Sequence, residues 1–203
     1  RMQALGAVFG QKSGWERPNW FAPEGVPQED HWSFRRSRWF EHVGNECRRL
    51  REKVGVIDLT PFTKFEVTGP GAEGWLDSLV ANKVPTKVGR IALCHALTQR
   101  GGIRSEFTIT KLADHHYYVV SAGAAERYDS DFLQKRLPTD GSVALRNITG
   151  SRGVFVLAGP RARDVMAKLT DVPLDNASFP WLTGQVIEAG LAVREIVQPH
   201  ADE

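Results

Sequence analysis

Residues 91–98 read IALCHALT, residues 99–102 read QRGG, and residues 103–110 read IRSEFTIT. Two runs of alternating apolar residues therefore flank a Gly-Gly pair. This pattern is typical of a β-hairpin, because glycine reaches the positive φ values that a tight loop needs. The stretch predicts the two central strands of a sheet.

The register of this hairpin decides which side chains face the core, because successive side chains alternate between the two faces of a strand. With a three-residue loop (100–102), we expect Glu106 opposite Ala96, on a face of small side chains that leaves room for a flat ligand. An ordinary charge on a solvated sheet face is the alternative reading of Glu106. The other face is apolar apart from His95 and Ser105 and is predicted to be the core face, with Ile91, Leu93, Leu97, Ile103, Phe107 and Ile109.

The composition describes an ordinary globular chain of 203 residues, with 26 basic and 24 acidic residues and a net charge of +2. This balance does not argue for a nucleic-acid partner. Two cysteines, Cys47 and Cys94, cannot build a disulfide framework, and no Cys/His spacing matches a metal site. Both are expected to be small buried side chains. We predict no membrane span and a cytoplasmic location, or the mitochondrial matrix if the source is eukaryotic.

Residues 1–39 read as a loop-like arm that is rich in aromatic residues, and we expect it to wrap a larger body and bury its rings there. The run 35–38 (RRSR) beside Trp32 and Trp39 has two readings, a nucleic-acid stacking surface or the anchor of the arm. Residues 40–197 are expected to form the main domain, with a possible subdivision near 55–140, and residues 198–203 a tail.

Hydrophobic periodicity predicts a helix over 40–54 that ends in a basic cluster closed by Gly55, and a second helix over 124–137. A single strand is expected over 186–197. The order of elements indicates an α+β fold with mostly antiparallel sheets and flanking helices. Further strands are predicted over 56–59, 63–68, 117–121, 143–146 and 154–158.

Residues 69–74 (GPGAEG) match the Gly-x-Gly-x-x-Gly dinucleotide fingerprint. We reject that reading because no acidic residue ends the next predicted strand, where a ribose partner belongs. The same Gly-Pro-x-Ala sequence also recurs 90 positions later, in residues 158–162 (AGPRA), without the other two glycines. A glycine turn followed by proline in the first helical turn predicts a structural joint.

Four runs in order, 54–60 (VGVIDLT), 65–72 (FEVTGPGA), 97–103 (LTQRGGI) and 156–162 (VLAGPRA), resemble the glycine-cleavage T-protein (aminomethyltransferase) family. Residues 14–21 (GWERPNWF) and 95–98 (HALT) are similar to one branch of it. That branch is the tetrahydrofolate-binding C-terminal region of dimethylglycine and sarcosine dehydrogenases.

The resemblance implies an aminomethyltransferase folate-binding fold that captures a methylene unit from an N-methylglycine-type amine donor as 5,10-methylene-tetrahydrofolate. It implies tetrahydrofolate as the cofactor, and a flavin-dependent dehydrogenase domain or subunit that would carry FAD. The family places an acidic residue, usually Asp, after the hairpin glycines, and the matching residue here is Glu106. By the same resemblance, Glu106 is the expected catalytic residue, and the expected folate-binding residues are Leu93, His95, Thr108 and Tyr118.

The chain also departs from the family pattern. T-proteins usually carry Tyr where Leu93 stands and Asn where Ala122 stands. The pattern fades after about Ile196, so we expect the family's C-terminal barrel to be missing. A truncated chain of this kind has an alternative function, as a non-catalytic scaffold or interaction module that keeps only the folate-binding fold.

Overall fold

The computed structural model describes residues 1–190 and 192–197. The chain divides into two compact units. Unit 1 comprises Arg1–Leu59 and Phe155–Arg163, and unit 2 comprises Thr60–Val154 and Asp164–Glu203. All strand pairs in both units are antiparallel among the described residues. The predicted α+β fold with mostly antiparallel sheets is therefore confirmed.

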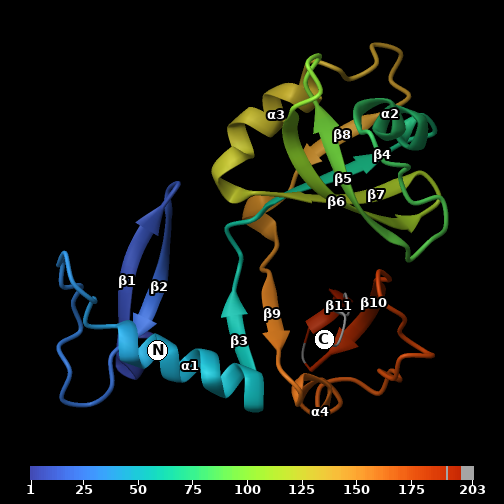
Figure 1. Cartoon of the computed structure of the whole chain (residues 1–203). Helices are drawn as coiled ribbons and strands as arrows, with labels where there is room; N and C mark the ends of the chain where they lie inside the picture. Colours follow the sequence, from blue (N-terminus) through green and yellow to red (C-terminus); the bar gives the residue numbers. More distant parts are fainter. Residues whose placement is uncertain (191, 198–203) are drawn as a thin grey trace. The chain divides into compact units, whose positions relative to one another are not determined.

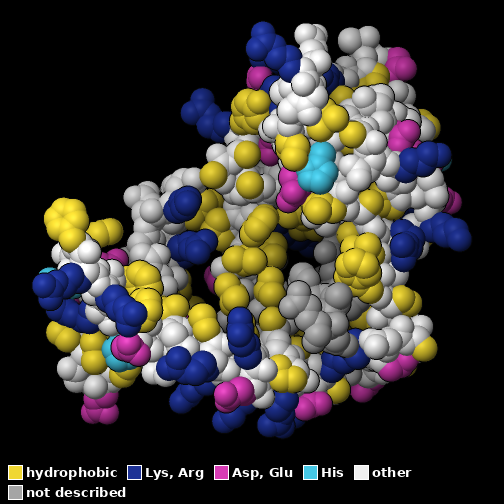
Figure 2. Space-filling view, viewed as in Figure 1, with side chains coloured by type: hydrophobic (Ala, Val, Ile, Leu, Met, Phe, Trp, Pro, Cys, Tyr) yellow, Lys and Arg dark blue, Asp and Glu magenta, His cyan; other side chains and the backbone are white. Residues whose placement is uncertain are grey.

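Unit 1 contains a hairpin, a helix and a two-stranded ribbon (Figure 1). Its elements are η1 (Gln3–Leu5), β1 (Ala7–Lys12), β2 (Trp15–Phe21), α1 (Phe40–Glu52), β3 (Gly55–Asp58) and β9 (Phe155–Ala158), and α4 (Ala162–Met166) begins in it. The predicted helix is confirmed, with Arg49 and Arg51 in its last turn, although it ends at Glu52 and Gly55 already begins β3. Basic side chains gather over this helix in Figure 2.

The N-terminal arm is not loop-like throughout, because β1 and β2 form a hairpin. Its two-residue turn, Ser13-Gly14, has φ values of 53° and 85°. Two successive positive φ values characterise the turn type that matches the twist of paired strands. The expected burial of the rings holds for Trp20, which stacks on His42 and donates a hydrogen bond to Asp30. It fails for Trp32, which is 90% exposed.

Unit 2 is built on one five-stranded sheet in the order β5-β6-β7-β4-β8. Two helices pack on one face of it, and their apolar side chains (Trp75 and Leu76 from α2, Phe132 and Leu133 from α3) join the main hydrophobic core. The elements of the unit are β4 (Thr63–Thr68), α2 (Ala72–Leu79), β5 (Ile91–Leu97), β6 (Ile103–Ala113), β7 (His116–Ser121), η2 (Gly123–Ala125), α3 (Glu126–Gln134), β8 (Ala144–Asn147), η3 (Thr149–Ser151), β10 (Gln185–Ala189) and β11 (Ala192–Val197).

The predicted β5–β6 hairpin exists, but its predicted register is wrong. Glu106 pairs with His95 rather than Ala96, and Cys94 pairs with Phe107. The loop is longer than three residues, since Leu97 pairs with Ile103, and a register shift follows at once in the ladder. In β6, Ser105, Phe107 and Ile109 are buried as predicted, but Ile103, also expected in the core, is 67% exposed. In β5, Ile91 is buried as predicted, but the rest of the strand is turned over: Cys94 and Ala96 are buried, and Leu93 and Leu97 are exposed.

Three smaller expectations are also corrected. The single strand expected over 186–197 is a hairpin, β10–β11, with Gly190 at positive φ in its turn. The helix expected over 124–137 is a short 3-10 turn followed by α3, which ends at Gln134. Cys94 is buried, but Cys47 is exposed. The predicted tail, 198–203, lies outside the described residues.

The two Gly-Pro segments are alike in geometry as well as in sequence. Gly69 and Gly159 have φ values of 115° and 110°. Each accepts a hydrogen bond from the alanine three residues later, at 3.0 Å from Ala72 and 2.9 Å from Ala162. An added Cβ would lie 2.3 Å from the Ser142 carbonyl oxygen at Gly69, and 2.5 Å from that of Leu50 at Gly159. Both glycines are therefore required by the backbone, as a structural joint demands.

A polar triad of buried Lys111, buried Tyr117 and partly exposed Glu73 connects α2 to the sheet. Lys111 donates to Glu73 at 2.8 Å, and the Tyr117 hydroxyl donates to the same carboxylate oxygen at 2.6 Å. These two hydrogen bonds hold the pKa of Glu73 below its ordinary value. Burial, and then the hydrogen bond to Glu73, raise the pKa of Tyr117. The triad therefore favours an ionised Glu73 and a neutral Tyr117.

The ionised Glu73 of this triad predicts that the free energy of unfolding decreases at acid pH. A carboxylate whose pKa is lowered by folding stabilises the chain fully above its unfolded-state pKa, and this contribution is lost as the pH falls through the folded-state value. Glu73→Gln should therefore lose less of its free energy of unfolding than wild type between about pH 6 and about pH 3. Urea unfolding at both pH values measures this, with the exposed Glu46→Gln as control. Equal acid losses in Glu73→Gln and wild type would contradict the assignment.

Candidate functional site

The five residues that the sequence singled out share one face of the sheet, opposite the helix-covered face. Leu93 pairs with Thr108, His95 with Glu106, and Tyr118 with Thr110 in the neighbouring strand pair. All five are at least partly exposed. We call this surface, defined by Leu93, His95, Glu106, Thr108 and Tyr118, the site face.

Glu106 and His95 are the ionisable pair of the site face. The Nε2 atom of His95 lies 3.1 Å from Oε2 of Glu106, and the two side chains are 29% and 60% exposed. His95 is the one hydrogen-bond partner of this carboxylate among the described residues, so the second oxygen, Oε1, stays available. Leu93, 48% exposed, adds an apolar surface on the same strand.

A second polar cluster lies on the same side of the sheet, one strand beyond Tyr118. Glu66 pairs with Tyr118 across β4 and β7, accepts a hydrogen bond from Arg146, and lies 3.0 Å from Nε2 of His116. Burial raises the pKa of Glu66, but the hydrogen bonds from Arg146 and His116 outweigh it, so the pKa lies below its ordinary value. The Glu66 carboxylate is therefore ionised, and each of its two oxygens has a partner, at the border of the site face.

This cluster around Glu66 was not predicted from the sequence, although a signal for it existed. Phe65 and Val67 are fully buried, and the residue between them must point to the other face of the strand. A charged residue there predicts a polar surface, which is where Glu66 lies. Its partners come from β7 and β8, and no local pattern connects those strands with β4.

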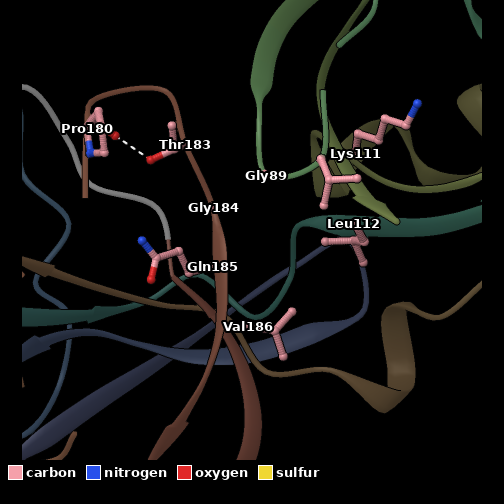
Figure 3. Close-up of a pocket in the computed structure, with 9 residues that line it drawn as sticks. Gly89, Lys111, Leu112, Pro180, Thr183, Gly184, Gln185 and Val186 are labelled. Carbon is pink, nitrogen blue, oxygen red and sulfur yellow. Dashed lines mark hydrogen bonds between the residues drawn. The ribbon is translucent and has the colours of Figure 1, made fainter. Parts of the chain in front are cut away.

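A groove elsewhere in unit 2 was not predicted either. It is lined by Gly89, Lys111, Gly184 and their neighbours (Figure 3). Its walls are joined by backbone hydrogen bonds, including Gly184 N to Gly89 O at 2.7 Å. The Lys111 amine points away from the 180–186 segment in Figure 3 and donates to Glu73 and to the Thr86 carbonyl. The polar side chains that line the groove already form hydrogen bonds within the chain, so we interpret it as a contact between packed segments. The site face, in contrast, has ionisable groups that remain accessible to a ligand.

Two further observations limit the kinds of site in the part of the chain that the structure describes. No cluster of three or more His, Cys, Asp or Glu side chains is arranged to hold a metal ion. None of the helices in residues 1–190 and 192–197 combines the length and apolar character needed to cross a membrane.

The fold is that of an aminomethyltransferase-like domain. The structure resembles that of the glycine cleavage system aminomethyltransferase T from Bartonella henselae, with a TM-score of 0.70 and 23% identity, over 90% of this chain and 44% of that chain. The family model described as "GCVT N-terminal domain" matches residues 1–197, and the chain belongs to this family.

Its curated relatives include much longer proteins. The chain is 38% identical over 175 residues to the mitochondrial dimethylglycine dehydrogenase of Mus musculus, covering 86% of this chain and 20% of that protein. It is 31% identical over 210 residues to the mitochondrial pyruvate dehydrogenase phosphatase regulatory subunit of Mus musculus, covering 100% of this chain and 24% of that protein. The chain thus spans about a fifth to a quarter of the length of these relatives.

Proposed function

We propose that this chain is the tetrahydrofolate-binding part of a one-carbon-transfer enzyme. The amine donor would be of the N-methylglycine type, and the product 5,10-methylene-tetrahydrofolate. A flavin-dependent dehydrogenase domain or subunit would oxidise the donor. The names of the two mammalian relatives place them in mitochondria, so a mitochondrial matrix location would suit a eukaryotic source, and the cytoplasm a bacterial one. The observation that carries the proposal is the Glu106 carboxylate on the site face, in a chain of the aminomethyltransferase family.

The chemistry of the site face fits a reduced pterin. A pterin is flat and carries several N–H donors, and a carboxylate is an acceptor that favours charge-assisted hydrogen bonds. Oε1 of Glu106 is available for such a donor, because Oε2 is the oxygen that faces His95. Leu93, which pairs with Thr108, and Tyr118, which pairs with Thr110, offer apolar and aromatic surface to the pterin ring.

In this proposal the chain's own residues orient a reactant and hold a proton. Tetrahydrofolate, when bound, supplies the secondary amine that accepts the one-carbon unit. Glu106 would accept a hydrogen bond from that amine and leave its lone pair free to react, which is the role of a general base. Leu93, Thr108 and Tyr118 would hold the ring in one orientation. Alignment of this kind supplies much of the acceleration in reactions between two bound partners.

Glu106→Gln tests the proposal. The amide keeps the size of the side chain but removes its charge, so tetrahydrofolate should bind about tenfold to a hundredfold more weakly, as expected for the loss of one charge-assisted hydrogen bond. Isothermal titration calorimetry on the 203-residue chain measures this affinity. Glu188→Gln, an exposed substitution in β10, should bind like wild type.

The proposal is wrong if folded Glu106→Gln binds tetrahydrofolate with wild-type affinity. Thermal unfolding of each variant shows whether the fold is intact. Because Glu106 is largely exposed and on the surface of the sheet, its substitution should change the free energy of unfolding by less than about 1 kcal/mol.

A second candidate function is that of a non-catalytic scaffold or interaction module. It is favoured by the similarity, over the whole chain, to a protein named as a regulatory subunit. The same calorimetry separates the two functions, since a scaffold should give no heat with tetrahydrofolate at any accessible concentration.

A further inference from the structure

His95 is held in place through its backbone as well as through its ring. β5 is an edge strand of the sheet. The backbone N–H of His95 donates to Oδ1 of Asn82 at 3.2 Å, and its carbonyl accepts a hydrogen bond from the backbone N–H of Ala81 at 2.9 Å. Both backbone groups therefore point away from β6, toward the turn that follows α2.

This arrangement has a direct consequence for the pairing of His95 with Glu106. Two residues that face each other in an antiparallel pair without exchanging backbone hydrogen bonds have the closer Cα spacing, and their side chains lie closer together. His95 and Glu106 are such a pair. The imidazole is thus brought to the carboxylate by strand geometry, and the 3.1 Å contact follows from it.

The ring restrains a side chain that would otherwise be mobile. An exposed glutamate has three rotatable bonds and loses their freedom when it is fixed by a ligand. Since a carboxylate only accepts hydrogen bonds, Nε2 of His95 must carry the proton that is shared with Oε2. With one oxygen held, Glu106 keeps its other oxygen directed for a ligand before the ligand arrives.

We propose that His95 is a positioning residue that acts through Glu106, rather than a direct contact of folate. This inference rests on the proposed function and adds a defined role for one residue of the same site. It replaces the role that the family resemblance implies for His95, that of a folate-binding residue.

A double-mutant cycle tests the proposal on the 203-residue chain. His95→Leu removes the donor and keeps an apolar side chain like those at Leu93 and Leu97 on the same face, and His95→Gln restores an N–H donor. We expect tetrahydrofolate to bind about fivefold to tenfold more weakly to His95→Leu, and within about twofold of wild type to His95→Gln. In a Glu106→Gln background, His95→Leu should change the affinity by less than about twofold.

The control is His31→Leu, an exposed histidine in unit 1, which should bind like wild type. If the His95→Leu and Glu106→Gln effects multiply in the double variant, His95 contacts folate independently and the proposal is overturned while the proposed function stands. If the wild-type chain gives no heat, the proposed function fails, and this role fails with it. The ring itself gives a separate readout: ¹⁵N NMR should show His95 held as the Nε2–H tautomer in wild type, and a mixture of tautomers in Glu106→Gln.

Discussion

Gly69→Ala should lower the free energy of unfolding by about 3 kcal/mol or more. Gly69 has a φ of 115°, and an added Cβ would lie 2.3 Å from the Ser142 carbonyl oxygen. The clash cannot be relieved cheaply, because Gly69 lies in the joint between β4 and α2 and the Ser142 carbonyl is itself held by a backbone hydrogen bond from Gly71 at 3.0 Å. Urea unfolding followed by circular dichroism measures the loss.

Gly74→Ala is the matched control within the same glycine-rich segment. Gly74 lies inside α2, where nothing would contact an added Cβ within 4 Å. Alanine should therefore stabilise the helix by about 0.5–1 kcal/mol. The two alanine variants should therefore change the free energy of unfolding in opposite directions, although both glycines belong to the same Gly-x-Gly-x-x-Gly match. We expect this difference if Gly69 serves a structural joint. A Gly69→Ala variant that unfolds at the wild-type urea concentration would contradict this account.

Ala96→Lys should also cost about 3 kcal/mol or more, because it would place an unpaired ammonium in the core of unit 2. Ala96 is fully buried on the helix-covered face, opposite Ser105. Its neighbour Leu97 is 44% exposed, so Leu97→Lys should change the free energy of unfolding by less than about 1 kcal/mol.

These two adjacent substitutions test the hairpin register directly, since the register predicted from the sequence would reverse their effects. Thermal unfolding of the two variants side by side measures the difference. A stable Ala96→Lys together with an unfolded Leu97→Lys would restore the register with Glu106 opposite Ala96.

The reason for the wrong register is specific. In β5, Leu93 and Leu97 look like core residues, and Cys94 and Ala96 look like a small-residue surface. In the structure the ladder shifts by one position between Ala96 and Leu97, and Arg104 is the extra residue on β6. Its guanidinium lies 4.2 Å from the centre of the Tyr128 ring in α3. The extra residue thus contacts a helix residue 24 positions later in the chain, and no local sequence pattern contains such a contact.

Local chemistry, in contrast, did determine much of the fold. The bounds of β4 agree with the predicted strand, and the Gly-Pro joints are as expected. The Ser13-Gly14 turn of the first hairpin was a recognisable signal that the prolines and tryptophans around it obscured. At the site, the position of Glu106 on the face opposite the core followed from alternation in β6 alone. Leu93 and His95 joined it on that face only because β5 is turned over.

The paired joints at Gly69 and Gly159 have a wider consequence for how such chains vary. What they require is a main-chain torsion that few residues can adopt and a carbonyl close by, and neither requirement involves a particular side chain. A repeat of this kind can therefore remain recognisable in backbone conformation after the sequence similarity between its two copies has become weak.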